Sequence, residues 1–325
     1  MKTKAIRISC TGKPEVMQLQ SVDLNNPRAD QVLLRHTAIG VNFIDTYHRS
    51  GLYQLELPAG IGMEATGIVE AIGPDVSAFS VGDRVAYCGA PVGAYAEARL
   101  LSERFLLRIP EGVADKDVAA SLLKGMTACF LLTRTRALAA GETILWHAAA
   151  GGVGLLAVQW AKHLGARVIG TVGSQEKASL AKKYGCDHII NYRDESVSDR
   201  VRELTEGRGV PVVYDSVGQA TFDGSLQSLE KFGLLVSFGN ASGPVEPFSP
   251  LQLASHGSLY VTRPTLMDHI ADLQVYREMA GQVFSLLNNG VLRPLHGQEY
   301  ALVDAASAHG ALEGRDTVGS SILIP

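Results

Sequence analysis

The sequence predicts an α/β protein with two domains, one a barrel-like antiparallel β domain and the other a doubly wound parallel sheet. Up to about Arg108, short β-branched runs are separated by turn residues, as in antiparallel sheets. After Asp115, strand-like and helix-like segments alternate, which is typical of a parallel sheet covered on both faces. The length of 325 residues also favours two domains, because single cores seldom grow beyond ~250–300 residues.

The individual elements follow from these patterns. The first domain should hold the strand-like runs KAIRIS, QVLLRHTAIGV, ATGIVEAIG, DRVAYC and GAYAEARLL. Helical stretches are expected from Lys116 to about Leu138 and from Met267 to about Asn289. Strands of the second domain should begin at Glu142, Ala166, His188, Val212, Leu234 and Ser258. The last strands, ending in SSILIP, are expected to return to the first domain, so we predict domain segments 1–124, 125–264 and 265–325.

The composition is that of a globular protein, with 46% apolar and 19% charged residues. A formal net charge of −4 disfavours nucleic acid and anionic membrane surfaces as partners. No uninterrupted apolar stretch reaches the ~18 residues of a membrane span, and the N-terminus has no apolar targeting segment. The four cysteines have no CxxC spacing, so we expect reduced thiols in a soluble, cytoplasmic protein.

The strongest local signal is AAAGGVG, residues 148–154, between a predicted strand and a predicted helix. It contains a variant of the GxGxxG dinucleotide fingerprint, with alanine at the first position. Residues without bulk let the backbone approach a pyrophosphate, which then faces the N–H groups of the helix N-terminus. We therefore expect Gly151, Gly152, Val153 and Gly154 to bind a dinucleotide. The alternative is a tight glycine turn without a ligand.

The end of the next strand indicates which dinucleotide. An acid is expected there for the ribose of NAD, but the chain reads Gly173-Ser174-Gln175. Ser174, Lys177 and Tyr192 instead offer hydroxyls and a cation, which suit a 2′-phosphate. NADPH is therefore the expected cofactor. Taken alone, Lys177 could be a solvated helix residue and Tyr192 a rim aromatic.

The chain as a whole resembles the quinone oxidoreductases, which are zinc-free members of the medium-chain dehydrogenase/reductase superfamily related to ζ-crystallin. The resemblance spans nearly the whole chain and rests on motifs in the family's order: GVNFIDTYHRSGLY, GMEATGIVEAIG, GDRVAY, GAYAEA, KGMTA, AAAGGVG, GTVGS and VYDSVG. It implies a GroES-like catalytic domain, a Rossmann domain and an active site in the cleft between them. It also implies a homodimer through Rossmann edge strands, for which SLYVT is the candidate.

The resemblance also assigns residues. It puts Asn42, Asp45 and Tyr47 beside the nicotinamide, and Tyr53 and Arg263 are candidates for the substrate wall. The remaining cofactor residues that it implies are Thr127, Gly152 and Val153 along the phosphates and ribose, Ser216, Phe238, Gly239 and Asn240 in the groove, and Arg315 near the adenine. Alternatively, Asn42 and Asp45 are helix-cap residues, and Tyr47 and Tyr53 are core aromatics.

Three departures from the zinc alcohol dehydrogenases of this superfamily predict that no metal is bound. Where those enzymes place a cysteine, a histidine and a third ligand, this chain has Asn42, Met63 and a position near Lys124. Amide, thioether and ammonium groups are poor zinc ligands.

The expected reaction is metal-free hydride transfer from nicotinamide C4 of NADPH to a quinone, with Tyr47, Tyr53 or Arg263 donating to the developing oxyanion. We interpret His48 and His147 as structural residues. Three alternatives stay open: a 2-alkenal or enone reductase, a zinc alcohol dehydrogenase with substituted ligands, and a non-catalytic NADPH-binding protein of the crystallin or RNA-binding kind.

Overall fold

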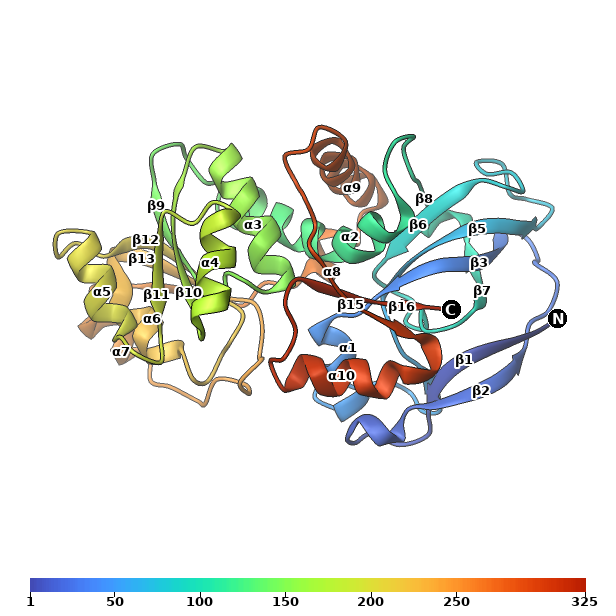
Figure 1. Cartoon of the computed structure of the whole chain (residues 1–325), viewed down its shortest axis with the longest axis horizontal. Helices are drawn as coiled ribbons and strands as arrows, with labels where there is room; N and C mark the ends of the chain where they lie inside the picture. Colours follow the sequence, from blue (N-terminus) through green and yellow to red (C-terminus); the bar gives the residue numbers. More distant parts are fainter. The chain divides into compact units, whose positions relative to one another are not determined.

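Two units divide the chain in the computed structural model, which describes all residues from Met1 to Pro325 (Figure 1). Unit 1 comprises Met1–Met126 together with Ile270–Pro325, and unit 2 comprises Thr127–His269. Both boundaries lie a few residues beyond the positions expected from the sequence. The predicted fold class, a mainly β domain with a doubly wound α/β domain, is confirmed.

Unit 1 contains two sheets. In the smaller one, β1 (Lys2–Ile8) pairs on either side with β2 (Gln18–Asp23) and β4 (Ala59–Gly60). The larger sheet has the order β15-β16-β3-β5-β6-β8, with β7 also paired to β3. Its strands are β3 (Gln31–Gly40), β5 (Glu64–Ile72), β6 (Arg84–Cys88), β7 (Ala98–Ser102), β8 (Leu107–Arg108), β15 (His296–Ala301) and β16 (Ser320–Ile324). The C-terminal strands β15 and β16 therefore complete a sheet that begins near the N-terminus.

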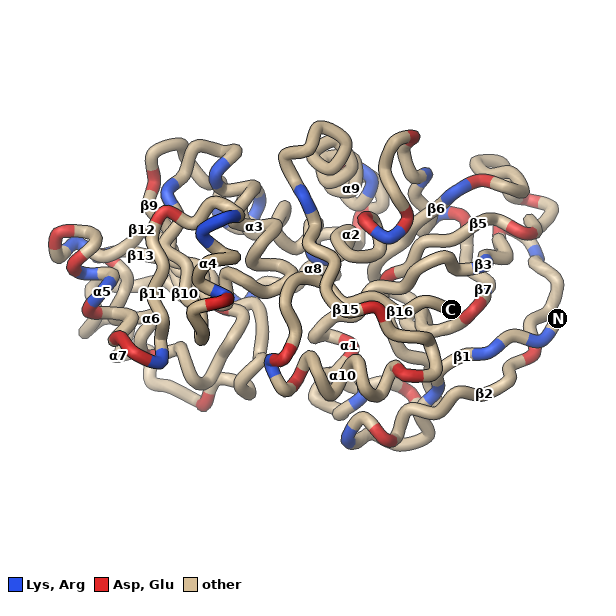
Figure 2. The backbone as a smooth tube through the Cα atoms, in the orientation of Figure 1, with Lys and Arg blue, Asp and Glu red and all other residues tan.

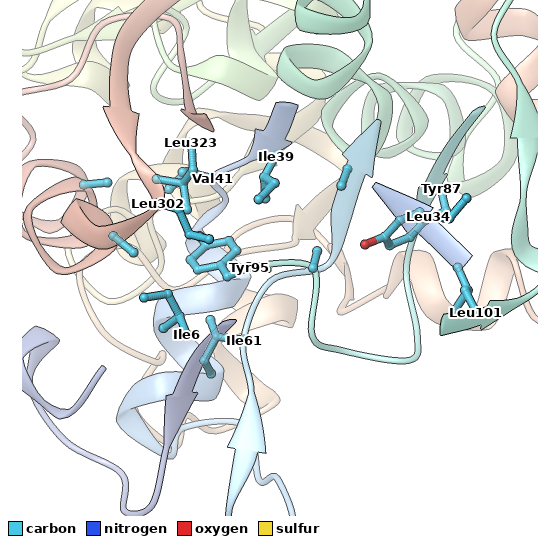
Figure 3. Packing of buried hydrophobic residues seen from close by; sticks show 14 of the residues in the cluster. Ile6, Leu34, Ile39, Val41, Ile61, Tyr87, Tyr95, Leu101, Leu302 and Leu323 are labelled. Atoms are coloured by element: carbon cyan, nitrogen blue, oxygen red, sulfur yellow. The ribbon is translucent and has the colours of Figure 1, made fainter. Parts of the chain in front are cut away.

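Four α-helices accompany these sheets. They are α1 (Phe43–Ser50), α2 (Asp115–Phe130), whose last residues from Thr127 belong to unit 2, α9 (Leu273–Asn288) and α10 (Ala305–Glu313), with short 3₁₀ turns at Pro14–Val16, Glu103–Phe105 and Leu302–Asp304. The core is built from alternate strand residues that face inward. Figure 3 shows the ring of Tyr95 among Ile6, Ile61, Val41 and Leu302 in this core. All five side chains are buried, and Ala305 and Ala308 of α10 belong to the same cluster.

Unit 2 is a six-stranded parallel sheet of order β11-β10-β9-β12-β13-β14. The strand order reverses between β9 and β12, and ligands bind at such a reversal point in sheets of this kind. Figure 1 shows helices on both faces of the sheet. The strands are β9 (Thr143–Trp146), β10 (Arg167–Val172), β11 (His188–Asn191), β12 (Val210–Asp215), β13 (Leu229–Ser237) and β14 (Tyr260–Thr262), and the helices are α3 (Gly152–His163), α4 (Gln175–Lys183), α5 (Val197–Leu204), α6 (Phe222–Ser228), α7 (Leu251–Ser255) and α8 (Leu266–His269).

Several elements differ from the sequence prediction. The helix expected from Met267 to Asn289 is two helices, α8 and α9, because Asp272 caps a new helix by accepting the N–H of Gln274 at 2.7 Å. The helix expected to reach Leu138 is α-helical only to Phe130 and continues as a π-helix, where the Thr133 hydroxyl donates to the Cys129 carbonyl. Strand β13 starts at Leu229 rather than Leu234, strand β12 at Val210 rather than Val212, and strand β14 at Tyr260 rather than Ser258.

Charged residues of both signs are mixed along the chain, without a long basic stretch (Figure 2). None of the helices combines the length and the apolar character needed to cross a membrane.

Candidate functional site

The glycine-rich loop of unit 2 connects β9 to α3. Ala148 turns the chain with a φ of 54°, and its carbonyl accepts the N–H of Gly151 at 2.9 Å. A Cβ at Gly154 would lie 2.4 Å from that same carbonyl oxygen, a distance that no side chain tolerates. Glycine is therefore required at this position for α3 to start directly beneath the end of the strand.

The N-terminus of α3 fits a pyrophosphate. Its N-cap residue, Gly151, has no side chain, so no side-chain acceptor occupies the first N–H groups of the helix at Gly152, Val153 and Gly154. Gly151 to Val153 are partly exposed. A helix of 12 residues with an uncapped, partly open N-terminus presents hydrogen-bond donors and the positive end of its dipole to an anion.

The next strand end carries the groups predicted for a 2′-phosphate. Ser174 is the N-cap of α4, and its hydroxyl accepts the N–H of Lys177 at 3.2 Å, which leaves the hydroxyl hydrogen for a second partner. Tyr192 follows β11 and packs over Gly173, where an added Cβ would lie 2.3 Å from the tyrosine oxygen. The structure therefore brings Gly173, Ser174, Lys177 and Tyr192 to the neighbouring ends of β10 and β11, where the residue that follows β10 is a glycine rather than an acid.

The groove residues Ser216 and Phe238–Asn240 lie together at the ends of β12 and β13. The N–H of Phe238 donates to the Asp215 carbonyl at 2.8 Å, and a Cβ at Gly239 would lie 2.4 Å from the Ser216 carbonyl oxygen. Arg263 joins this group by donating to the Ser237 carbonyl at 3.1 Å and, in the amide orientation that satisfies both ends of the Asn240 side chain, to its oxygen at 3.2 Å. Thr127 is half-buried near the end of α2.

In unit 1, the candidate residues lie on or beside α1. Asn42 is the N-cap of α1, and its backbone N–H donates to the Asp45 carboxylate at 2.9 Å. For Asp45 the structure therefore shows the helix-cap arrangement, with the side chain fully buried. The Asn42 side chain takes part in the same capping box, and its Nδ2 also donates to Glu64 at 2.8 Å.

Asp45 belongs to a buried polar chain. The Tyr95 hydroxyl donates to the Asp45 carboxylate at 3.0 Å and lies 3.0 Å from Nε2 of His309 on α10. Burial raises the pKa of Asp45 to about 7. Burial lowers the pKa of His309 to about 3, and the nearby Arg49 guanidinium adds to this effect. At neutral pH, therefore, His309 is neutral and Asp45 is partly protonated.

Tyr47 and Tyr53 form an aromatic pair. Their ring centroids are 5.3 Å apart in an edge-to-face arrangement, and the N–H of Tyr53 donates to the Tyr47 carbonyl at 3.1 Å. Tyr47 is buried, whereas Tyr53 is half-buried. His48 packs edge-on against Tyr53, and burial lowers its pKa, so it is a neutral part of this aromatic group at pH 7.

Glu64 is a residue of this region that sequence reasoning missed. It is fully buried, and its carboxylate accepts from Asn42 Nδ2, from the Leu123 N–H at 2.7 Å and from Lys124 Nζ at 3.4 Å. It therefore fixes the amide of Asn42. Its sequence signal is a lone acid inside the apolar run IGMEATGIV, because buried carboxylates need charged or hydrogen-bonded partners.

Two of the positions that the resemblance compares with zinc ligands, Asn42 and Lys124, meet at Glu64. Asn42 and Lys124 both donate to Glu64, and Met63 beside it is buried. An ammonium group and a donor amide oppose a dication rather than bind it. No group of three or more His, Cys, Asp or Glu side chains forms a metal-binding cluster.

The predicted site residues thus form two groups, each described within its own unit. Asn42, Asp45, Tyr47 and Tyr53 lie in unit 1, as does Arg315, which follows α10 with a φ of 63°. The others lie in unit 2: Thr127, Gly151, Gly152, Val153, Gly154, Gly173, Ser174, Lys177, Tyr192, Ser216, Phe238, Gly239, Asn240 and Arg263. Their roles toward a ligand stay predictions.

A GroES-like unit joined to a dinucleotide-binding unit defines the class of medium-chain dehydrogenases and reductases. Two family models match accordingly, the alcohol dehydrogenase GroES-like domain over residues 28–111 and the zinc-binding dehydrogenase over residues 152–280.

Full-length comparisons are more specific. The chain is 49% identical to a quinone oxidoreductase of Pseudomonas aeruginosa over 99% of both chains. The structure of Escherichia coli quinone oxidoreductase complexed with NADPH matches with a TM-score of 0.97 and 45% identity, covering 99% of this chain and 100% of that one. A 2-haloacrylate reductase of a Burkholderia species is 43% identical over 97% of this chain and 96% of its own. The chain belongs to the quinone oxidoreductase family.

Proposed function

We propose that this protein is an NADPH-dependent quinone oxidoreductase that works without a metal. The observation that carries the proposal is the strand end at Gly173, where two hydroxyl groups and a lysine stand in place of the acid that holds the ribose of NAD. Relatives with 45–49% identity over nearly the whole chain are named quinone oxidoreductases, and one of the matching structures is an NADPH complex.

The residues of unit 2 would hold the cofactor. The uncapped N–H groups of α3 would receive the pyrophosphate, while Ser174, Lys177 and Tyr192 would receive the 2′-phosphate. The segment Phe238–Asn240, tied to Arg263, would form the wall of the groove. When bound, the nicotinamide supplies the hydride.

Residues of unit 1 are the proposed contacts of the nicotinamide and of the hydride acceptor. Asn42, whose amide is fixed by Glu64, would orient the nicotinamide from the start of α1. Tyr47, Tyr53 and Arg263 would donate to the oxygen on which negative charge develops, an effect worth about 2.7–4 kcal/mol per donor in other enzymes. A quinone is a suitable acceptor for a site with these hydrogen-bond donors, because its reduced anion is stabilised by conjugation and can take its proton from water.

The test is the oxidation of cofactor by the purified protein with 1,4-benzoquinone, using NADPH and NADH side by side. We expect turnover with both, with a much lower KM for NADPH. NADPH binding without turnover of any quinone would instead identify a non-catalytic nucleotide-binding protein, and absence of binding would refute the proposal altogether.

A second candidate reaction is the reduction of an activated C=C bond. The observation that favours it is the 43% identity to a 2-haloacrylate reductase. Both reactions deliver hydride to a conjugated acceptor, so the same cofactor site serves them. Rates with 2-alkenals and with 2-haloacrylate, measured beside the quinones, decide between them: a higher kcat/KM for either alkene class would reverse our assignment.

We also propose a cytoplasmic homodimer paired through β14. This strand is the edge of the unit 2 sheet, and Tyr260 on it is 61% exposed. None of the four cysteines forms a disulfide, which suits a reducing compartment. Sedimentation equilibrium should give twice the mass of the chain, and Tyr260→Lys should lower it to that of one chain. A wild-type monomer would contradict this assembly.

A further inference from the structure

His147 lies immediately before the glycine-rich loop and is 1% exposed. Both of its ring nitrogens have partners: Nε2 lies 3.0 Å from the Ser225 hydroxyl, and Nδ1 lies 3.0 Å from the Thr171 hydroxyl. Burial lowers the pKa of His147, so the ring is neutral at physiological pH and carries a single hydrogen.

The position of that hydrogen follows from Asp215. The Ser225 hydroxyl donates to the Asp215 carboxylate at 2.8 Å, so its oxygen is left to accept from Nε2–H of His147. Nδ1 then has only a lone pair and accepts from the Thr171 hydroxyl. The Thr171 oxygen in turn accepts the N–H of Ala148 at 3.3 Å. Every donor in the chain from Asp215 to Ala148 therefore points the same way.

This chain connects the two loops proposed to hold the cofactor. At one end, the Asp215 carboxylate accepts the N–H groups of Val217 and Gly218 at 2.8 and 3.1 Å, which shapes the loop after Ser216. At the other end is Ala148, the residue of left-handed conformation on whose carbonyl Gly151 and Gly154 are packed. The links between them come from β10, α6 and the residue that follows β9.

We propose that His147 is a positioning residue for the dinucleotide: through Ser225 and Thr171 it holds the Ala148 turn and the loop after Ser216 at a fixed spacing. The inference rests on the proposed nucleotide function of this unit. A histidine suits the position because a neutral imidazole accepts a hydrogen bond at one nitrogen and donates one at the other, so a single ring joins Thr171 to Ser225.

The test cuts the chain on either side of His147 and leaves the ring in place, since replacing the ring itself could unfold the unit. Ser225→Ala removes the link to Asp215, and Thr171→Val removes the link to Ala148. Ser228→Ala is the matched control, because this equally buried serine on the same helix donates only within the helix, to Gly224. Thermal unfolding of all variants checks that each is folded.

We expect Ser225→Ala and Thr171→Val each to raise the Kd for NADPH roughly two- to tenfold, the range for one lost hydrogen bond. Ser228→Ala should leave it unchanged. The double variant should bind NADPH about as well as whichever single variant binds it less tightly, because the loss of one link already breaks the chain of hydrogen bonds. Equal Kd values for Ser225→Ala and Ser228→Ala, or multiplication of the two single effects in the double variant, would overturn the proposal.

Two further measurements keep this inference separate from the cofactor assignment. In the nucleotide-free protein, amide hydrogen exchange at Ala148–Gly151 should be faster in Ser225→Ala than in Ser228→Ala. Nitrogen NMR should show His147 neutral with its hydrogen on Nε2. A wild-type protein that binds no NADPH would refute the proposed function, whereas exchange that does not differ, or a hydrogen on Nδ1, would refute the role of His147.

Discussion

Gly173→Ala tests whether the Tyr192 hydroxyl recognises the 2′-phosphate. The backbone at Gly173 is not in the left-handed region, so alanine fits the chain conformation. Its Cβ, however, would lie 2.3 Å from the Tyr192 oxygen and 2.7 Å from its ring carbon Cζ. Because Tyr192 is 41% exposed, its side chain can swing outward, and the expected result is a folded protein with a displaced hydroxyl.

The magnitude follows from the bond that is lost. A hydrogen bond to a charged group contributes about 1.5–3 kcal/mol, which corresponds to roughly 10- to 100-fold in Kd. Titration of the purified variant should therefore show NADPH binding weakened by up to that factor and NADH binding unchanged. Tyr192→Phe should give the same selective loss, and the double variant should add nothing further.

Gly224→Ala is the control for this experiment. A Cβ at Gly224, on α6, meets nothing within 4 Å, so the variant should keep its affinity for NADPH and gain up to about 1 kcal/mol in helix stability. If Gly173→Ala and Tyr192→Phe both retain the wild-type ratio of NADPH to NADH affinity, Tyr192 does not contact the phosphate and the reasoning fails.

Four further changes test other parts of the structure. Lys177→Ala should raise the KM for NADPH much more than that for NADH in steady-state assays, and equal effects would exclude its phosphate contact. Gly154→Ala should abolish nucleotide binding in calorimetry, because its Cβ would lie 2.4 Å from the Ala148 carbonyl oxygen; wild-type affinity would show that the loop yields. Glu64→Ala should lower the free energy of unfolding by about 3–5 kcal/mol in denaturant titrations, since it strands Lys124, and a loss below 1 kcal/mol would contradict this. The free energy of unfolding of the wild type should fall as the pH rises from about 4 to 7, because the unfolded carboxyl of Asp45 loses its proton near pH 3.8 and the folded one near pH 7. Asp45→Asn should remove this fall. Parallel curves of unfolding free energy against pH for variant and wild type would refute the raised pKa.

Local patterns predicted the secondary structure of unit 2 well, because each strand and helix there is a short run with its own periodicity. The glycine-rich loop was predicted on the same basis, since strand, loop and helix are consecutive. The break between α8 and α9 was missed because the apolar pattern continues across it, although Asp272 is a strong cap. The π-helix after Phe130 contains a hydroxyl bond from Thr133 to the Cys129 carbonyl, and the apolar periodicity of the sequence does not reveal the change of helix type.

The candidate site was harder to predict wherever its contacts join distant parts of the chain. Glu64 is held by the Leu123 N–H and by Lys124, some sixty positions away, and the sequence does not show that they meet. The same holds for His147, whose partners Thr171 and Ser225 lie on other elements. We interpreted it as a structural residue, and the structure adds that both of its nitrogens are engaged. Ser174, by contrast, could be predicted because it caps the helix in which Lys177 lies.

The arrangement around Glu64 has a consequence for redesign. Introducing zinc would require more than Asn42→Cys, because a thiolate there would face the Glu64 carboxylate and would repel it without the amide donor. Lys124 would still place its positive charge beside the incoming ion. A zinc-dependent variant of this protein would therefore have to change several of these side chains together. No single substitution among them should improve zinc binding by itself.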